Sequence, residues 1–309
     1  MSVTSQPFGA QVHEVDRRDI ADTPIEYDDP DLRCYALTAY ASPEAKQVAY
    51  DVPATPDLYT GFLIRAPWSG TQYIKSMRAL IDNQKVVHHL LLLRQHRTGS
   101  EGIVPNGTGI HNDADMLYAW APGASDLWLG REVGMEMPEG SLLMMENHYN
   151  NRGGAPAPDK SGVEVCVTPR KPKNVAALSY VGTDLIFGAS ARGTCTHESR
   201  EPVHLIMAFP HMHTKGVHMK VDWTRANGTR STLHDQPFDA SSQRQFLYRD
   251  VVLQPGDKLT TSCTFSGPSV FGKGSADEMC IFFSLHYPAG ALAKKSLFQA
   301  LHGPNTCID

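Results

Sequence analysis

The feature that most constrains the fold of this chain is a series of short apolar or alternating segments separated by clusters of Gly, Pro, Asn and Asp. Side chains of a β-strand alternate between the two faces of a sheet, so such segments indicate strands. Helical periodicity is scarce, and the sequence therefore predicts an all-β protein. The clearest segments are KVVHHLLLL, SLLMMENHY, VEVCVTP, HLIMAFPHMH, HMKVDWT, FLYRDVVL, KLTTSCTF and MCIFFSLHY.

Two Asn-Gly pairs, Asn106-Gly107 and Asn227-Gly228, are typical of tight turns in β-hairpins. The second pair lies between VDWTRA and TRSTL, as a hairpin requires. Both pairs also belong to N-x-T sequences, which are acceptors for glycans. We interpret them as turns, because that reading needs no glycan.

The length of 309 residues exceeds what one hydrophobic core usually serves and predicts two domains. The stretch from Thr168 to Asn174 is rich in Pro and Lys and is the predicted linker. The domains then comprise residues 1–170 and 171–309, each long enough for a sandwich of several strands.

The charge pattern excludes some classes of partner. The net charge is −5, and the sequence contains no basic cluster, so binding to nucleic acid or to anionic lipid is not expected. It also lacks the run of about 18 apolar residues that a membrane span needs.

Six cysteines are scattered through the chain, and none forms a C-x-x-C pair. An even, scattered set indicates disulfides, which predicts a secreted or periplasmic protein, although six buried thiols in a cytosolic protein are the alternative. The first ten residues, MSVTSQPFGA, lack the features of a signal peptide. Either a leader has been removed or the prediction of export is wrong.

Two histidines separated by one residue, His211 and His213, follow the apolar run HLIMA. Residues i and i+2 of a strand share one face, roughly 6 to 7 Å apart, so both imidazoles can bind one metal ion. The alternative is ordinary polarity on a half-exposed strand.

Two adjacent histidines, His88 and His89, lie in the apolar segment VVHHLLLL. Neighbours on a regular strand point to opposite faces, so both can bind one ion only if the strand bulges or the rings use different nitrogens. Buried imidazoles need a partner for each nitrogen, and a metal provides one. His148 in MMENHYNN is the candidate third ligand, and the alternative is one core and one surface histidine.

Met279 is the candidate third ligand for His211 and His213, since it starts an apolar strand just after Asp277 and Glu278. A methionine at such a position is usually part of the core. As a ligand, however, its thioether would select Cu(I), and the set would favour copper over zinc.

With these residues in place, the sequence resembles a known family over nearly its whole length, from about Cys34 to Cys307. It is similar to the copper type II, ascorbate-dependent monooxygenases, the family of dopamine β-hydroxylase and peptidylglycine α-hydroxylating monooxygenase, and its wording is closer to the dopamine β-hydroxylase branch. The matching segments follow the family order. They are VVHHLLLL, AWAPG (Ala119–Gly123), NHYNN (Asn147–Asn151), HMHTKG (His211–Gly216), LQPGDKLTTSCTF (Leu253–Phe265) and DEMC (Asp277–Cys280).

The resemblance implies two jelly-roll-like β-sandwiches that face each other across a cleft, each with one copper. It assigns the electron-transfer site to the N-terminal domain and the oxygen and substrate site to the C-terminal domain. The implied ligands are His88, His89 and His148 for the first site and His211, His213 and Met279 for the second. The implied disulfides are Cys34–Cys166, Cys195–Cys307 and Cys263–Cys280.

The function implied is hydroxylation of a C–H bond of a small organic substrate with dioxygen and electrons from ascorbate. A non-catalytic copper-binding or copper-delivery protein could keep the same ligands, and a disulfide-linked adhesion module could keep only the fold. Oxygen uptake with ascorbate separates these alternatives.

The substrate pocket is less constrained. Peptide-hydroxylating members have an arginine two residues before the His-x-His pair and an asparagine two residues after the ligand methionine, and here these positions are Phe209 and Ile281. A peptidylglycine carboxylate would therefore lack a charged partner. We expect Phe209, Ile281, Phe283 and His286 to line the pocket, with ordinary core packing as the alternative.

Overall fold

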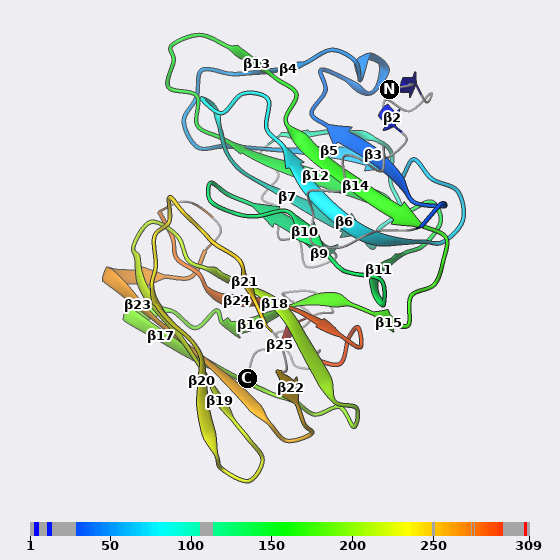
Figure 1. The fold of residues 1–309 in the computed structure, drawn as a ribbon. Coiled ribbons are helices and arrows are strands. Elements are labelled where there is room, and N and C mark those ends of the chain that lie inside the picture. Colours follow the sequence, from blue (N-terminus) through cyan, green and yellow to red (C-terminus); the bar gives the residue numbers. More distant parts are fainter. Residues whose placement is uncertain are drawn as a thin grey trace. The chain divides into compact units, whose positions relative to one another are not determined.

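The computed structural model describes residues 29–105, 114–248, 251–272, 274, 276–292 and 306–307, and the backbone of the short strands at 3–5 and 11–13. The chain divides into two compact units. Unit 1 comprises residues 1–109, 116–120 and 125–175, and unit 2 comprises residues 110–115, 121–124 and 176–309. The regular structure of the described residues is strand apart from the 3-10 turn at Pro43–Ala45 (Figure 1), which confirms the all-β prediction.

Unit 1 is a β-sandwich of an eight-stranded sheet, in the order β1-β2-β3-β14-β6-β11-β15 with β10 on β6, and a five-stranded sheet, in the order β8-β5-β12-β7-β9; β13 and β4 form a separate pair. The strands are β1 (Val3–Ser5), β2 (Gln11–His13), β3 (Arg33–Thr38), β4 (Tyr50–Val52), β5 (Leu58–Arg65), β6 (Gln72–Leu80), β7 (Val87–Gln95), β8 (Gly102–Pro105), β9 (Ala114–Trp120), β10 (Leu127–Trp128), β11 (Val133–Met137), β12 (Leu142–Tyr149), β13 (Ala157–Asp159), β14 (Gly162–Thr168) and β15 (Asn174–Val175).

Unit 2 is a sandwich of a six-stranded sheet, in the order β21-β18-β24-β16-β25 with β22 on β18, and a four-stranded sheet, in the order β17-β23-β19-β20. The strands are β16 (Ala177–Thr183), β17 (Phe187–Thr196), β18 (Val203–His211), β19 (Gly216–Thr224), β20 (Arg230–Pro237), β21 (Phe246–Leu247), β22 (Val252–Leu253), β23 (Lys258–Val270), β24 (Cys280–Tyr287) and β25 (Thr306–Cys307).

Two turn and strand predictions have clear outcomes. Asn227-Gly228 joins β19 to β20 as predicted, and Gly228 has a φ of 87°, which a glycine adopts without strain. The segment FLYRDVVL was predicted as one strand and is instead two short strands, β21 and β22, that both pair with β18. Asn106-Gly107 lies outside the described residues.

Three disulfides join the cysteines, Cys34–Cys166 in unit 1 and Cys195–Cys307 and Cys263–Cys280 in unit 2. These are the pairs that the resemblance implies. The Cys34–Cys166 bridge links the paired strands β3 and β14, and Cys263–Cys280 connects the four-stranded sheet to the six-stranded sheet through β23 and β24.

Central strands are buried on both faces. All eight residues of β12 are buried, including the polar side chains of Glu146, Asn147 and His148. Polar groups in such a strand need partners, so this strand is where a functional site is expected. The core of unit 2 lies between its two sheets and includes Val181, Met219 and Phe282.

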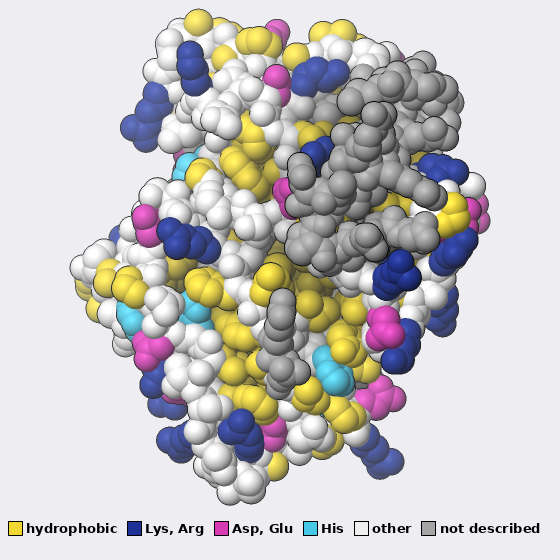
Figure 2. Space-filling view, viewed as in Figure 1, with side chains coloured by type: hydrophobic (Ala, Val, Ile, Leu, Met, Phe, Trp, Pro, Cys, Tyr) yellow, Lys and Arg dark blue, Asp and Glu magenta, His cyan; other side chains and the backbone are white. Residues whose placement is uncertain are grey.

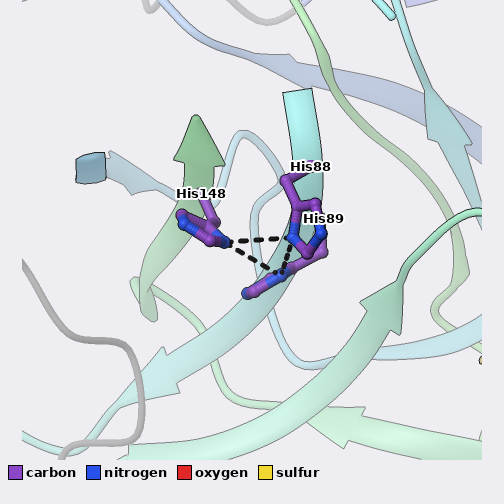
Figure 3. A group of neighbouring side chains, drawn as sticks. All are labelled: His88, His89 and His148. Atoms are coloured by element: carbon purple, nitrogen blue, oxygen red, sulfur yellow. Dashed lines mark hydrogen bonds between the residues drawn. The ribbon is translucent and has the colours of Figure 1, made fainter. Parts of the chain in front are cut away.

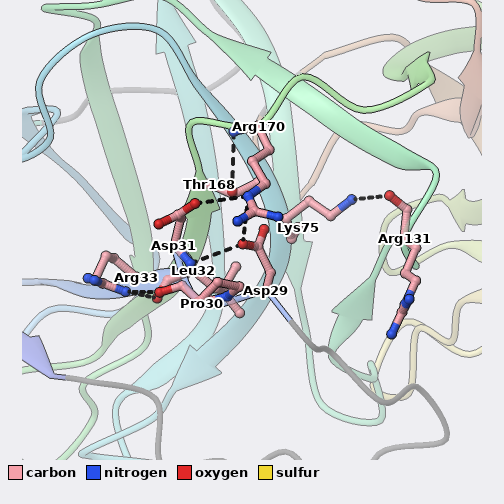
Figure 4. A network of polar contacts seen from close by, with 9 residues as sticks. All are labelled: Asp29, Pro30, Asp31, Leu32, Arg33, Lys75, Arg131, Thr168 and Arg170. Atoms are coloured by element: carbon pink, nitrogen blue, oxygen red, sulfur yellow. Dashed lines mark hydrogen bonds and ion pairs between the residues drawn. The ribbon is translucent and has the colours of Figure 1, made fainter.

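The end of unit 1 is tied to its beginning by ion pairs (Figure 4). The Arg170 guanidinium contacts the carboxylates of Asp31 at 2.8 Å and Asp29 at 3.4 Å. Nearby, the buried Lys75 donates hydrogen bonds to the backbone oxygens of Arg131 and Val133. These contacts fix the segment after β14 and the strand-to-strand connection before β11.

Charged side chains of both signs are interspersed on the face of the molecule shown in Figure 2. Within the described residues, no helix is long and apolar enough to cross a membrane.

Candidate metal centre

A β-bulge brings the adjacent histidines of β7 to one side. His148 on β12 pairs with His89 on β7, but the next residue, Tyr149, pairs with Val87. His88 is therefore the extra residue of a bulge, which breaks the alternation of faces. The sequence required a bulge or the use of different ring nitrogens, and the structure has the bulge.

The three imidazoles of unit 1 point their Nδ1 atoms at one another (Figure 3). The Nδ1 of His88 lies 3.2 Å from those of His89 and His148, and the last two are 3.3 Å apart. A ring nitrogen either carries a proton or offers a lone pair, so in such a triangle at least one pair consists of two donors or two acceptors. Hydrogen bonds among the three rings cannot resolve this conflict, whereas a cation bound by three lone pairs does.

The size of the triangle suits a metal ion. The centre of an equilateral triangle with sides of 3.2 Å lies about 1.85 Å from each corner. Bonds from imidazole nitrogen to a transition metal are about 2.0 to 2.1 Å long. His148 is buried, while His88 and His89 are partly exposed, so the triangle has a buried side and an open side.

Two residues of unit 1 fix the ring of His148. Its Nε2 lies 2.8 Å from Oδ1 of Asp57, and Tyr59 stacks on the ring with centroids 4.1 Å apart and planes at 4°. The carboxylate accepts the Nε2–H, so the lone pair of the ring is on Nδ1. Burial lowers the pKa of His88, and the Asp57 carboxylate opposes this shift. Burial is the larger effect and favours a neutral His88 imidazole able to bind a metal.

In unit 2, His211 is the last residue of β18 and His213 follows it by two residues, with ring centroids 5.2 Å apart. Met212 between them is fully buried in the core of the unit. The two imidazoles thus share the opposite face, as alternation predicts. Gly216 ends this turn, and a Cβ there would lie 2.7 Å from Cβ of Met212, so only glycine fits.

Hydrogen bonds fix the tautomers of these two histidines. Nδ1 of His211 donates to Oε1 of Gln243 at 2.8 Å, and Nδ1 of His213 donates to the backbone oxygen of Asp277 at 3.1 Å. Both lone pairs are therefore on Nε2. Burial and the neighbouring His213 lower the pKa of His211 to about 3, and the hydrogen bond with Gln243 opposes this shift. This imidazole stays neutral.

Glu278 connects the His-x-His turn to the strand that starts at Cys280. Its buried carboxylate accepts hydrogen bonds from the backbone N–H of His213 at 2.9 Å and of Lys215 at 2.6 Å. His211 pairs with Ile281 in the antiparallel register of β18 and β24. Continuing this register by two residues places Met279 opposite His213 and on the same face.

The donor sets fit copper. In unit 1, three imidazole nitrogens form the site, and imidazole suits copper and zinc. Among the described residues, the only other group of His, Cys, Asp and Glu with converging atoms includes the disulfide-bonded Cys34 and Cys166, which are not free to bind an ion. No third residue of these types joins His211 and His213 in the described chain, so a thioether such as that of Met279 is the donor that would complete this set.

Three of the four residues expected in the substrate pocket lie together. Phe209 pairs with Phe283 across β18 and β24, and the Phe283 ring centroid is 5.7 Å from that of His211. Ile281 shares this face. His286 shares its face of β24 with Phe282 and Ser284, opposite to the face of Ile281 and Phe283, and its place in the pocket stays a prediction.

The sequence pattern indicates no role for Asp57, Gln243 or Glu278. They lie 91, 32 and 65 residues along the chain from the histidines they contact. No local pattern marks them. On a regular strand, the even number of His286 predicts a face opposite to that of Ile281 and Phe283.

Comparison with known proteins agrees with this geometry. The family described as copper type II ascorbate-dependent monooxygenase, N-terminal domain, matches residues 44–155, and its C-terminal domain matches residues 188–299. The first match includes the three histidines of unit 1, and the second includes His211, His213 and Met279.

Several curated relatives align with the chain. DBH-like monooxygenase protein 1 of Gallus gallus is 24% identical over 246 residues, which cover 67% of this chain and 40% of the relative. Dopamine beta-hydroxylase of Equus caballus is 25% identical over 203 residues, 56% of this chain and 33% of the relative. Peptidyl-glycine alpha-amidating monooxygenase A of Xenopus laevis is 26% identical over 266 residues, 78% and 27%. The chain thus aligns with less than half the length of these relatives. Because both domain models match, the chain belongs to the copper type II, ascorbate-dependent monooxygenase family.

Proposed function

We propose that this chain is a copper- and ascorbate-dependent monooxygenase that hydroxylates a C–H bond of a small organic substrate with dioxygen. The observation that carries the proposal is the triangle of Nδ1 atoms in unit 1, because hydrogen bonding cannot satisfy it and a metal ion can. Copper, when bound, supplies one-electron chemistry that amino-acid side chains lack.

In this proposal residues 1–170 form the electron-transfer domain. His88, His89 and His148 bind one copper through Nδ1, with the lone pair of His148 set by Asp57. Three neutral imidazoles on a rigid ladder between β7 and β12 change little between oxidation states, which suits a site that only stores an electron.

Residues 171–309 form the oxygen and substrate domain. His211 and His213 bind the second copper through Nε2, and Met279 adds a soft ligand that stabilises the reduced metal. Gln243 and the backbone oxygen of Asp277 keep both rings in the correct tautomer. Three protein ligands leave a position for dioxygen.

The substrate is expected to be largely apolar where it meets the second site. Phe209, Ile281 and Phe283 lie on the same face as His211 and bring no charge to it. A carboxylate-bearing substrate would lack an ion-pair partner among these three side chains. Three disulfides suit a secreted or periplasmic protein.

The test combines copper analysis with a substrate screen. The protein is reconstituted with copper, and oxygen uptake under ascorbate is measured with small aromatic amines, phenols and amidated-peptide precursors, with mass detection of the addition of one oxygen atom. We expect two coppers per chain and substrate-dependent oxygen uptake. Full copper binding without substrate-dependent uptake would indicate a copper-binding or copper-delivery protein, and well under one copper per chain with a preference for zinc would overturn the copper assignment.

A further inference from the structure

We propose that Asp57 is a positioning residue that acts through His148 to make the unit 1 site prefer Cu(II) over Cu(I), so that the two copper sites differ in redox preference. The inference rests on the proposed function, because it assumes that copper binds at both sites. It assigns a role to a side chain outside the ligand sets.

The contact is direct and specific. Oδ1 of Asp57 lies 2.8 Å from Nε2 of His148, the ring nitrogen opposite the one that faces His88 and His89. A carboxylate that accepts the second N–H of a metal-binding imidazole fixes the ring and increases its basicity. A more basic, partly anionic imidazole stabilises the higher charge of Cu(II).

The ring of His148 has little freedom to leave this contact. It is 4% exposed and stacks on Tyr59, whose backbone pairs with that of His148 across β5 and β12. The hydrogen bond to Asp57 is therefore formed at a fixed ring position, and it can transmit charge to the site without a change in ligand geometry.

The backbone at Asp57 is held in an unusual conformation. Its φ is +58°, and it is the only non-glycine residue with a positive φ in the part of the chain that the structure describes. Such a conformation costs free energy for most residues and is best tolerated by Asn and Asp. This conformation places the carboxylate at the bend before β5, directly against His148.

The acceptors that contact the two ring Nδ1 atoms of the second site carry no charge. Nδ1 of His211 donates to the amide oxygen of Gln243, and Nδ1 of His213 donates to a backbone oxygen. These neutral acceptors orient the rings and add less negative charge than a carboxylate does. Copper in unit 1 is then the weaker oxidant of the two, which favours release of its electron.

The backbone conformation dictates the variants. Asp57→Asn retains the acceptor oxygen and suits φ > 0 but removes the charge, and Asp57→Gly removes the side chain and also suits φ > 0. Asp57→Ala is avoided because it would add backbone strain. The matched control is Asp51→Asn, which removes the same charge from an exposed position on β4 of the same unit.

The first measurement needs no copper. In the metal-free protein, NMR of the histidine ring protons should show a strongly hydrogen-bonded Nε2–H for His148. We expect this signal to persist in Asp57→Asn and in the control and to disappear in Asp57→Gly. A wild-type ring without this signal, or one unchanged in Asp57→Gly, would overturn the positioning role.

The second measurement compares Cu(II) and Cu(I) affinity in a His213→Ala background, so that tight binding reports unit 1. We expect Asp57→Asn to weaken Cu(II) binding about 10- to 100-fold with a much smaller change for Cu(I), and so to raise the reduction potential. Equal effects on both ions, or values equal to those of Asp51→Asn, would overturn the inference alone. A parent protein that binds no copper in unit 1 would overturn the proposed function as well.

Discussion

The two histidine groups of this protein differ in how the fold brings their ring nitrogens together. In unit 1, three rings meet through Nδ1 because one bulge in β7 turns His88 and His89 toward His148 on the adjacent strand. In unit 2, two rings at the end of one strand present Nε2, and residues outside that strand set their tautomers. The first site is thus a property of a paired ladder, and the second depends on contacts from the segments that carry Gln243, Asp277 and Glu278.

The residue types of the candidate ligands do not by themselves define the two sites. The same side chain offers a different nitrogen in each unit because its other nitrogen meets a different acceptor. Asp57 is charged, and Gln243 and the backbone oxygen of Asp277 are neutral. Variants that change a ligand, its support or its partner should therefore affect the two sites by different amounts.

The largest effect is expected for Met279→Ile, which removes the proposed soft ligand of the second site at nearly constant volume. The loss of several kcal/mol of metal-derived stabilisation should lower turnover by more than about 100-fold. Copper in unit 1 should remain. Oxygen uptake and copper analysis check this, and the control is Met212→Leu, since Met212 lies in the core between the two histidines and should be dispensable for turnover. Unchanged turnover in Met279→Ile would exclude this residue as a ligand.

His148→Ala tests the other half of the comparison. It removes the buried corner of the Nδ1 triangle, and the two remaining nitrogens no longer form a three-ligand site. We expect copper to fall from two to about one per chain, with substrate hydroxylation reduced by about 100-fold. Full copper content in this variant would show that His148 is structural.

Much of this construction could be predicted from the sequence, and the reasons are local. Alternation placed His211 and His213 on one face, and the adjacency of His88 and His89 required an irregularity that proved to be a bulge. These features depend on neighbouring residues of one strand. By the same alternation, Met212 lies on the face opposite to that of His211, and His286 lies on the face opposite to that of Phe283.

The supporting residues could not be predicted because they come from distant segments. Asp57 contacts His148 across 91 residues of sequence. Its positive φ cannot be read from the residue type alone, because most aspartates have a negative φ. FLYRDVVL is apolar enough for one strand, yet it contains two short strands that each pair with β18. Register, not propensity, decides such cases.

Acid should separate the two units. Burial, with a smaller contribution from His197, lowers the pKa of His286 in unit 2 to about 4, although the backbone oxygen of Ser284 accepts a hydrogen bond from its Nδ1 and opposes this shift. At this residue the folded state then binds fewer protons than the unfolded state between about pH 6.5 and 4, so its contribution to the free energy of unfolding falls as the pH falls through that window, by roughly 3 kcal/mol for His286 alone.

In unit 1 the sign is opposite for Asp159, whose pKa is raised by burial, against hydrogen bonds from Ser161, Tyr149 and Asn83. At Asp159 the folded state binds more protons than the unfolded state, so the contribution of this residue to the free energy of unfolding rises as the pH falls. Denaturant unfolding of the metal-free protein at several pH values checks this, with His286→Leu expected to flatten the slope. His218→Gln, which removes a partly exposed imidazole of unit 2, is the control, and an unchanged slope in His286→Leu would contradict the assignment.

Glu278→Gln should weaken the second site through its backbone support. The buried carboxylate accepts two backbone N–H bonds, and an amide offers only one acceptor oxygen, so one donor would face an NH2 group. We expect a loss of about 2 kcal/mol in the free energy of unfolding and weaker copper binding in unit 2, with unit 1 unaffected. Denaturant midpoints and copper titrations measure both effects, and equal weakening in the two units would contradict a local role.

The smallest expected effect is also the most direct exchange between the two sites. Gln243→Glu gives His211 the carboxylate partner that His148 already has, at the 2.8 Å contact with Nδ1. If partner charge sets the preference for Cu(II), binding of Cu(II) in unit 2 should tighten about tenfold, or about 1.4 kcal/mol, with little gain for Cu(I). Gln236→Glu, at an exposed position on β20, controls for the added charge. Copper titrations that show no difference between the two variants would contradict this expectation. They would mean that a carboxylate at the ring nitrogen, which is how the partner of His148 differs from that of His211, does not set the preference for Cu(II).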